Sequence, residues 1–181
     1  GRLKARYASS SPQASVRYFE QLSKESSSNE NKYAYLTALQ ATGDFKKALM
    51  VVNELLSKYP KNLILNITKS EIYLSNQELD KAKMQIEKVL KISPGNYPAS
   101  IIKSNILSAQ NKTIQAEEIV RELLITKNND PHLWMLLSEI QRSGKNILGY
   151  HHSRGEYYLL LGDLENALNQ FQFGLRISGS S

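Results

Sequence analysis

A regular internal repeat runs through the chain and constrains its fold more than any other feature. Ala48 in GDFKKALMVV is followed by Ala82 in ELDKAKMQIE, and after the same interval by Ala116. Counting the same interval back from Ala48 reaches Ala14, so four alanines occupy the same position of the repeat. Self-similarity at a fixed spacing of about 34 residues indicates a solenoid, in which each repeat buries its apolar face only against its neighbours.

Each repeat is predicted to contain two helices. Between the turns the apolar residues follow helical spacing, as in Leu49, Val52 and Leu55, and no long stretch alternates as a strand would. Residues that start and stop helices divide the chain at matching points: Ser11-Pro12, Asp130-Pro131, Gly43, Gly144 and Gly162.

A pair of helices in a repeat of this length, with a small residue at the helix crossing and a closing proline, resembles the tetratricopeptide repeat. If Ala48 is the twentieth position of that repeat, the small eighth position falls on Ser70, Ser104 and Ser138. Leu36 at the eighth position of the first full repeat and Asn128 at a closing-proline position depart from the pattern. The resemblance implies an all-α fold, a right-handed α-α superhelix of about ten helices.

We expect residues 1–181 to form a single domain of this kind. The interval from Ala116 to Ala167 is one and a half periods, so helix 146–161 must serve two successive units. The expected units are a truncated repeat 1–25, full repeats 29–60, 63–94 and 97–128, and one and a half repeats in 131–178. Gly1 falls in the middle of a first helix, so we expect the chain to be part of a longer protein.

The stretch LGYHHSRGEYY contains three side chains of the types that bind zinc, His151, His152 and Glu156. On a helix, His152 and Glu156 share a face, while His151 points about 100° away. Zinc takes three or four ligands, and no second cluster has suitable spacing. We therefore interpret these residues as ordinary helix positions rather than metal ligands.

No catalytic motif is visible either. The chain has three histidines and no cysteine, and it contains neither a His-Glu-x-x-His zinc motif nor a glycine-rich phosphate loop. The net charge of +6 comes from lysines interleaved with glutamates, as in Glu54–Lys58 and Glu87–Lys91. A nucleic-acid partner is therefore not expected, and no apolar run is long enough to predict membrane insertion.

The carboxy-terminal part resembles a narrower family, the periplasmic zinc metalloproteases of the β-barrel assembly-enhancing type. Their closing helices carry a His-x-x-Arg-Ala-Glu-Tyr stretch, a Gly-Asp turn and an Ala-x-x-Gln-Leu helix. The matching residues are His151, Arg154, Glu156, Tyr157, Gly162, Asp163, Ala167 and Gln170. Gly155 replaces the alanine and Phe171 the leucine, and the segment 5–22 is similar to the one that joins protease and repeat domains there.

The resemblance implies a non-catalytic interaction domain that follows a zinc protease domain in the Gram-negative periplasm. Its partners would be that protease domain, the outer-membrane β-barrel assembly machinery and substrate proteins. No zinc ligand of the family lies in this chain, so no cofactor is expected here, and zinc would belong to the preceding domain. The alternative is a free-standing adaptor that binds a peptide segment of a partner.

A candidate binding groove follows from the repeat phase. In stacked helix pairs the fifth position of each first helix faces the concave side, and the nearby polar positions could set the register of a partner. The fifth positions are Tyr33, Ile67, Ile101, Met135 and His152, and the polar ones are Glu71, Asn105 and Glu139. This stripe is either open to a partner or covered from within the same protein.

Overall fold

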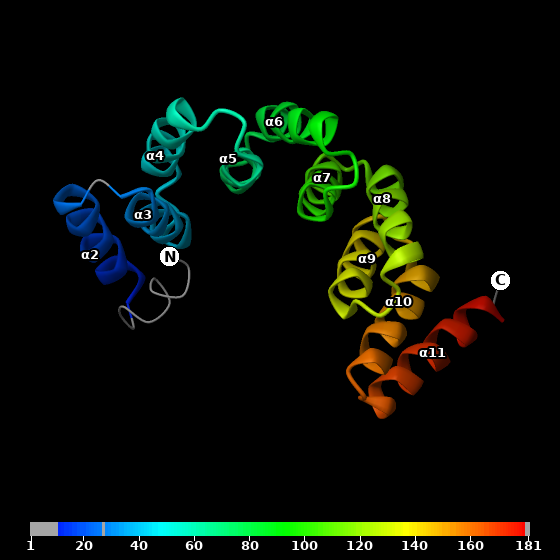
Figure 1. Cartoon of the computed structure of the whole chain (residues 1–181). Helices are drawn as coiled ribbons and strands as arrows, with labels where there is room; N and C mark the ends of the chain where they lie inside the picture. Colours follow the sequence, from blue (N-terminus) through cyan, green and yellow to red (C-terminus); the bar gives the residue numbers. More distant parts are fainter. Residues whose placement is uncertain (1–10, 27, 180–181) are drawn as a thin grey trace. The chain divides into compact units, whose positions relative to one another are not determined.

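The computed structural model describes residues 11–26 and 28–179 (Figure 1). These residues form ten α-helices and no strand, so the predicted all-helical fold is confirmed. The prediction that Gly1 lies within a helix falls outside the described residues. None of the described helices is long and apolar enough to cross a membrane.

The chain forms two compact units, Gly1–Pro94 and Gly95–Ser181, which we call unit 1 and unit 2. The helices of unit 1 are α2 (Pro12–Glu25), α3 (Asn29–Thr42), α4 (Phe45–Lys58), α5 (Leu63–Ser75) and α6 (Leu79–Ile92). Those of unit 2 are α7 (Tyr97–Ala109), α8 (Thr113–Thr126), α9 (Pro131–Ser143), α10 (Ile147–Leu160) and α11 (Leu164–Ser178).

In unit 1 each helix packs against the next one along the chain, from α2 to α6. The core includes Phe19, Leu39, Val52 and Ile72, all nearly inaccessible to solvent. Leu36, which departs from the small residue of the repeat pattern, is fully buried in this core.

The small eighth position has a visible function in the second full repeat. Ser70 Oγ donates a hydrogen bond of 2.8 Å to the carbonyl oxygen of Ala82, and both residues are fully buried. Because Ala82 is the twentieth position of the same repeat, the two small residues mark the point where the helices of the pair approach most closely.

Unit 2 has its own core, centred on Leu133, Leu137 and Ile140 of α9. Helix α10 packs against both α9 and α11, and that it serves two successive repeats stays a prediction. Where Asn128 stands in place of the closing proline, its carbonyl oxygen accepts a 2.7 Å hydrogen bond from Trp134 Nε1, which holds the turn onto α9.

The turn between the two helices of a pair repeats in its backbone conformation. One residue in each such turn has a positive φ, and those from Gly43 to Lys145 keep the interval of the sequence repeat. These residues are Gly43, Gln77, Asn111, Lys145 and, in the last pair, Gly162. The repeat is thus expressed in the main chain even where the side chain at this position changes.

Candidate functional site

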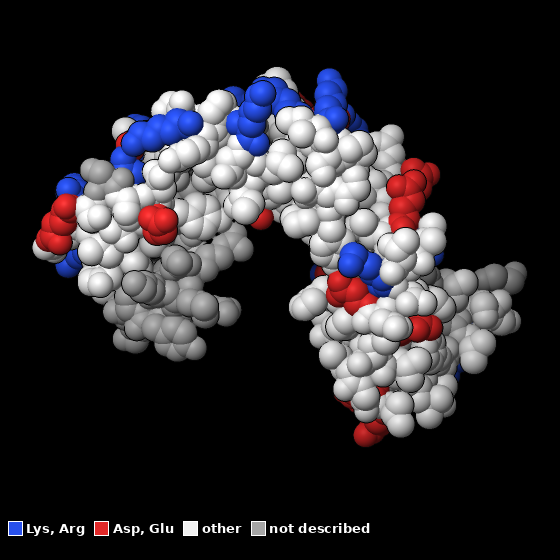
Figure 2. Space-filling view, viewed as in Figure 1, with Lys and Arg blue, Asp and Glu red and all other residues white. Residues whose placement is uncertain are grey.

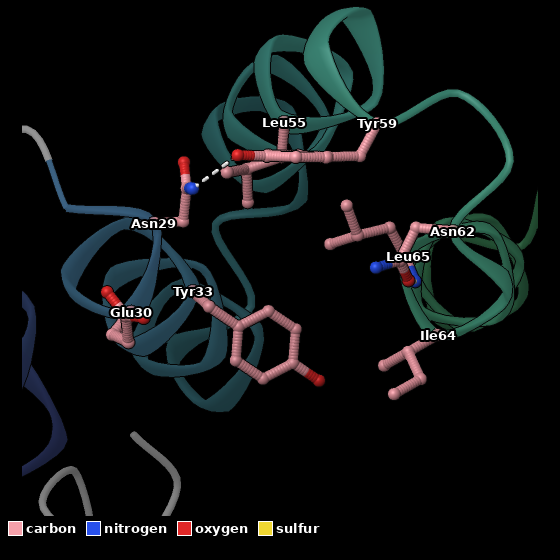
Figure 3. Close-up of a pocket in the computed structure, with 8 residues that line it drawn as sticks. All are labelled: Asn29, Glu30, Tyr33, Leu55, Tyr59, Asn62, Ile64 and Leu65. Atoms are coloured by element: carbon pink, nitrogen blue, oxygen red, sulfur yellow. Dashed lines mark hydrogen bonds between the residues drawn. The ribbon is translucent and has the colours of Figure 1, made fainter.

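A candidate site in unit 1 is a pocket of about 500 Å³ among α3, α4 and α5 (Figure 3). Helix α3 provides Tyr33, whose ring points into the space, and α4 provides Leu55 from its buried face. The full lining is Asn29, Glu30, Tyr33, Leu55, Tyr59, Asn62, Ile64 and Leu65.

Local backbone structure sets the positions of these side chains. Tyr59 follows the last residue of α4, where its N–H bonds to the carbonyl of Leu55 and ends the helix. Asn62 begins α5, because its side chain accepts a 3.0 Å hydrogen bond from Leu65 N–H. Pro60 and Lys61 form the turn between them, so one end of α4 and the start of α5 together shape one wall of the pocket.

The pocket has an apolar interior and polar groups on its rim. Asn29 Nδ2 donates a 2.8 Å hydrogen bond to the hydroxyl of Tyr59, which links α3 to the end of α4 across the opening. Ile64 is 63% exposed, although it lies beside the buried Leu65. Apolar walls with a few placed amides and hydroxyls are typical of sites that bind an apolar group and orient it by hydrogen bonds.

Sequence reasoning found one of these lining residues, Tyr33, and missed the others. Tyr59 and Ile64 had a signal in the sequence, two large apolar residues on either side of a proline turn, where polar residues are usual. The positions predicted from the repeat phase are expected on the concave side of the first helix of each repeat. The wall formed by the end of α4 and the start of α5 lies at the junction of two repeats, so those positions did not include it.

The remaining predicted groove residues in unit 1 have different environments. Ile67 is 8% exposed and therefore offers a partner little surface, and Glu71 is half-buried.

In unit 2, Ile101 packs against the core, and Asn105 is half-buried. Met135 Sδ accepts a 2.7 Å hydrogen bond from Arg154, and Glu139 forms an ion pair with Arg142. Because the predicted row divides between the two units, a continuous groove along it stays a prediction.

His152 lines a second, smaller pocket of about 240 Å³ between α10 and α11. Its Nε2 lies 3.8 Å from Glu156 Oε1, whereas His151 Nδ1 is 2.8 Å from Gln170 Oε1 on α11. The two histidines therefore contact different residues, Glu156 on the same helix and Gln170 on α11. Among the described residues no group of three His, Cys, Asp or Glu side chains could hold a metal ion.

Basic side chains are gathered over α4 and α6 on the face shown in Figure 2. At the starts of these helices, Lys47 forms an ion pair with Asp44 and Lys81 with Glu78. These pairs are local to helix starts, where an acidic residue is favourable. That the chain does not bind nucleic acid stays a prediction.

Comparison with solved structures gives the class of fold. A thermophilic tetratricopeptide-repeat protein of Thermus thermophilus superposes with a TM-score of 0.75 at 18% identity, over 96% of either chain. A tetratricopeptide-repeat protein of Parabacteroides merdae gives 0.66 at 16% identity, over 91% of this chain and 72% of that one. MamA from Desulfovibrio magneticus gives 0.57 at 17% identity, over 95% and 88%. The fold is therefore an all-helical solenoid of the tetratricopeptide-repeat type.

No family model matches the sequence. Among curated proteins, the chain is similar to sperm-associated antigen 1 of Rattus norvegicus, with 28% identity over 105 residues. That stretch is 58% of this chain and 12% of the relative, so the likeness concerns a small part of a much larger protein.

Proposed function

We propose that this chain is a non-catalytic protein-interaction domain that binds an apolar segment of a partner protein. The observation that carries the proposal is the pocket among α3, α4 and α5, because its apolar walls are open to solvent and its rim carries hydrogen-bonding groups. Solenoids of helix pairs commonly present such surfaces to extended or helical peptides.

In this proposal an apolar side chain of the partner enters between Tyr33, Leu55 and Leu65. The exposed Ile64 extends the contact beyond the pocket. The amide of Asn62 and the hydroxyl of Tyr59 lie at the rim, where they can bond to a partner backbone that is otherwise unpaired. Hydrogen bonds at the rim would thus set the direction in which the partner segment lies. Apolar contacts inside the pocket would provide most of the affinity.

The test is selection of peptides from a random phage-displayed library on the folded chain, followed by calorimetry with the selected peptides. Tyr33→Asp and Ile64→Asp place a charge in the apolar contact, so each is expected to weaken binding at least tenfold. Ile125→Asp is the matched control, because Ile125 is 80% exposed on α8 and lies outside this pocket. Equal binding by all variants would reject the pocket, and circular dichroism checks that each variant is folded.

The finer proposal is that the domain belongs to a periplasmic zinc metalloprotease and docks its protease domain, the outer-membrane β-barrel assembly machinery or its substrates. Support comes from the tail residues that match this family. Several of these residues meet between α10 and α11, as His151 does with Gln170, so the match concerns a packed structural unit. This proposal places zinc in the preceding protease domain and no cofactor in the chain itself.

Sequencing the coding region upstream of residue 1 tests the finer proposal. A His-Glu-x-x-His helix behind a secretory signal would support it, and fractionation would then be expected to place the protein in the periplasm. Further helical repeats without a zinc motif would favour the alternative, a free-standing adaptor. Peptide binding at the pocket is expected in either case, so the two proposals fail independently.

A further inference from the structure

The last helix of unit 2 carries an uncovered apolar stripe. Leu164, Leu168 and Leu175 of α11 are 66%, 57% and 71% exposed, and the half-buried Phe171 completes the row. At about 100° per residue these four side chains lie within about 60° of one another on the helix surface. Ala167 and Gly174, on the flank of the helix next to this stripe, are buried.

Unit 1 shows what this face of a second helix contacts when it is covered. The residues at the same repeat positions in α4 are Phe45, Leu49, Val52 and Leu56. They are buried or packed against the core of unit 1, where α5 lies against α4. The stripe of α11 is therefore a face of the kind that packs against another helix. One edge of it, at Phe171, lies against Gly155 of α10, the principal neighbour of α11, while the three leucines are exposed.

The spacing of the stripe suits a second copy of the same helix. Steps of four, three and four residues read the same in both directions, so two antiparallel α11 helices can align all four positions at once. Leu164 then faces Leu175 of the other copy, and Leu168 faces Phe171. An interface of this kind is isologous, because the same surface serves both partners.

The smaller pocket and the flanking charges agree with this register. The pocket lies beside Leu175 and Ser178 at the end of α11. In the antiparallel register Leu161 and Leu164 of the other copy reach this end, and Leu161 is itself exposed. Glu165 and Arg176 lie on one flank of the stripe, and antiparallel two-fold pairing brings like flanks together, so each would face its opposite charge.

We propose that this chain forms a two-fold symmetric dimer in which the α11 stripes, Leu164, Leu168, Phe171 and Leu175, pack antiparallel with Leu161 in the partner's α10–α11 pocket. The surface lies in unit 2, and the proposal is independent of peptide binding at the pocket in unit 1.

Sedimentation equilibrium of the whole chain over a wide concentration range tests the proposal. We expect a monomer–dimer equilibrium that Leu168→Asp weakens at least tenfold, because it buries a charge in the seam. Ile125→Asp, which alters an isoleucine on α8 that is 80% exposed, is expected to leave the equilibrium unchanged. A monomer at every concentration, larger non-saturating species, or equal loss in both variants would overturn the dimer.

Charge reversal tests the orientation separately. Glu165→Arg or Arg176→Glu alone places like charges on the shared flank and is expected to weaken dimerisation two- to fivefold. The double variant restores opposite charges and is expected to recover wild-type affinity. Recovery in the double variant supports antiparallel pairing, whereas additive loss would overturn the proposed register. Both residues are exposed, so folding should persist, which circular dichroism verifies.

Discussion

At the scale of single residues, Gly155 and Phe171 form a matched pair between α10 and α11. A Cβ atom on Gly155 would lie 2.3 Å from Cε1 of the Phe171 ring, far closer than atoms can approach. The missing side chain on α10 thus leaves the space that the larger ring on α11 occupies.

We predict that Gly155→Ala lowers the free energy of unfolding by about 1 kcal/mol. Alanine favours the helix by about 1 kcal/mol, but overpacking against the ring costs about 1 to 3 kcal/mol and outweighs it. Urea unfolding followed by the fluorescence of Trp134, the single tryptophan, measures the change.

The double variant Gly155→Ala with Phe171→Leu is expected to recover most of the loss, because leucine leaves room for the added methyl group. The coupling between the two substitutions is the informative quantity. Additive effects would show that the ring moves aside without cost, and that the two positions are independent.

A second residue-scale prediction concerns alkaline pH. Tyr97 on α7 donates a hydrogen bond to the carboxylate of Asp130, the residue that caps α9. Burial and then this carboxylate raise the pKa of Tyr97 to about 12. Because the pKa of tyrosine in an unfolded chain is about 10, the neutral phenol stabilises the fold below that pH, and its contribution is lost as the pH rises towards 12.

We therefore expect Tyr97→Phe to lose less stability than the wild type between about pH 9 and about pH 11. Urea midpoints from circular dichroism at the two pH values give the comparison. Tyr18→Phe on α2, where Tyr18 is 53% exposed, is the control and should keep the wild-type difference. If Tyr97→Phe lost as much stability between the two pH values as the wild type does, the role assigned to the Tyr97 hydroxyl would be wrong.

At the scale of elements, the turns within helix pairs contain avoidable strain. Gln77 and Lys145 have φ values of 61° and 58°, in the left-handed region that glycine adopts readily and most other residues do not. Asn111 has the same conformation at 59°, but asparagine tolerates it better. Because the φ values at the three positions are nearly the same, the strain energy should depend on the residue type. It should be smaller at Asn111 than at Gln77 and Lys145.

We predict that Gln77→Gly and Lys145→Gly each raise the free energy of unfolding by about 0.5 kcal/mol, and Asn111→Gly by less. The gain is modest because glycine also gives the unfolded chain more freedom. The reverse change, Gly43→Gln, should lower stability by about 1 kcal/mol for the same reason. Thermal and urea unfolding measure all four, and a loss in Gln77→Gly would show that its side chain is needed in the turn.

At the scale of the whole molecule, each unit has a core of its own, so unfolding need not be a single step. Trp134 packs against the core of unit 2 and reports on that unit, while far-ultraviolet circular dichroism reports on all helices. In a linear array, stability is approximately a sum of local terms and contacts between neighbours.

We expect Ile72→Ala, a fully buried change in unit 1 that costs about 2 to 4 kcal/mol, to lower the dichroism midpoint more than the Trp134 midpoint. Leu137→Ala in unit 2 should lower the unfolding midpoint measured by Trp134 fluorescence, because both residues belong to the core of that unit. If both probes shift equally in both variants, the array instead unfolds as one cooperative body.

The sequence by itself determined the period, the helix pairs and the small residues at their crossings. It did so because these features depend on local spacing: apolar residues three and four apart, caps at helix ends, and an alanine or serine at a recurring position. The start of α9 after Asp130 could be expected from the residues alone.

Only the tertiary structure decided which apolar surfaces are covered. Ile67 at a predicted groove position is buried, while Tyr59 and Ile64, which no groove position predicted, line a pocket. The stripe Leu164–Leu175 has the same spacing as its covered counterpart in α4, yet it is exposed. Helical spacing specifies which side chains share a face, but burial depends on whether another element lies against that face, and this is not encoded in local spacing.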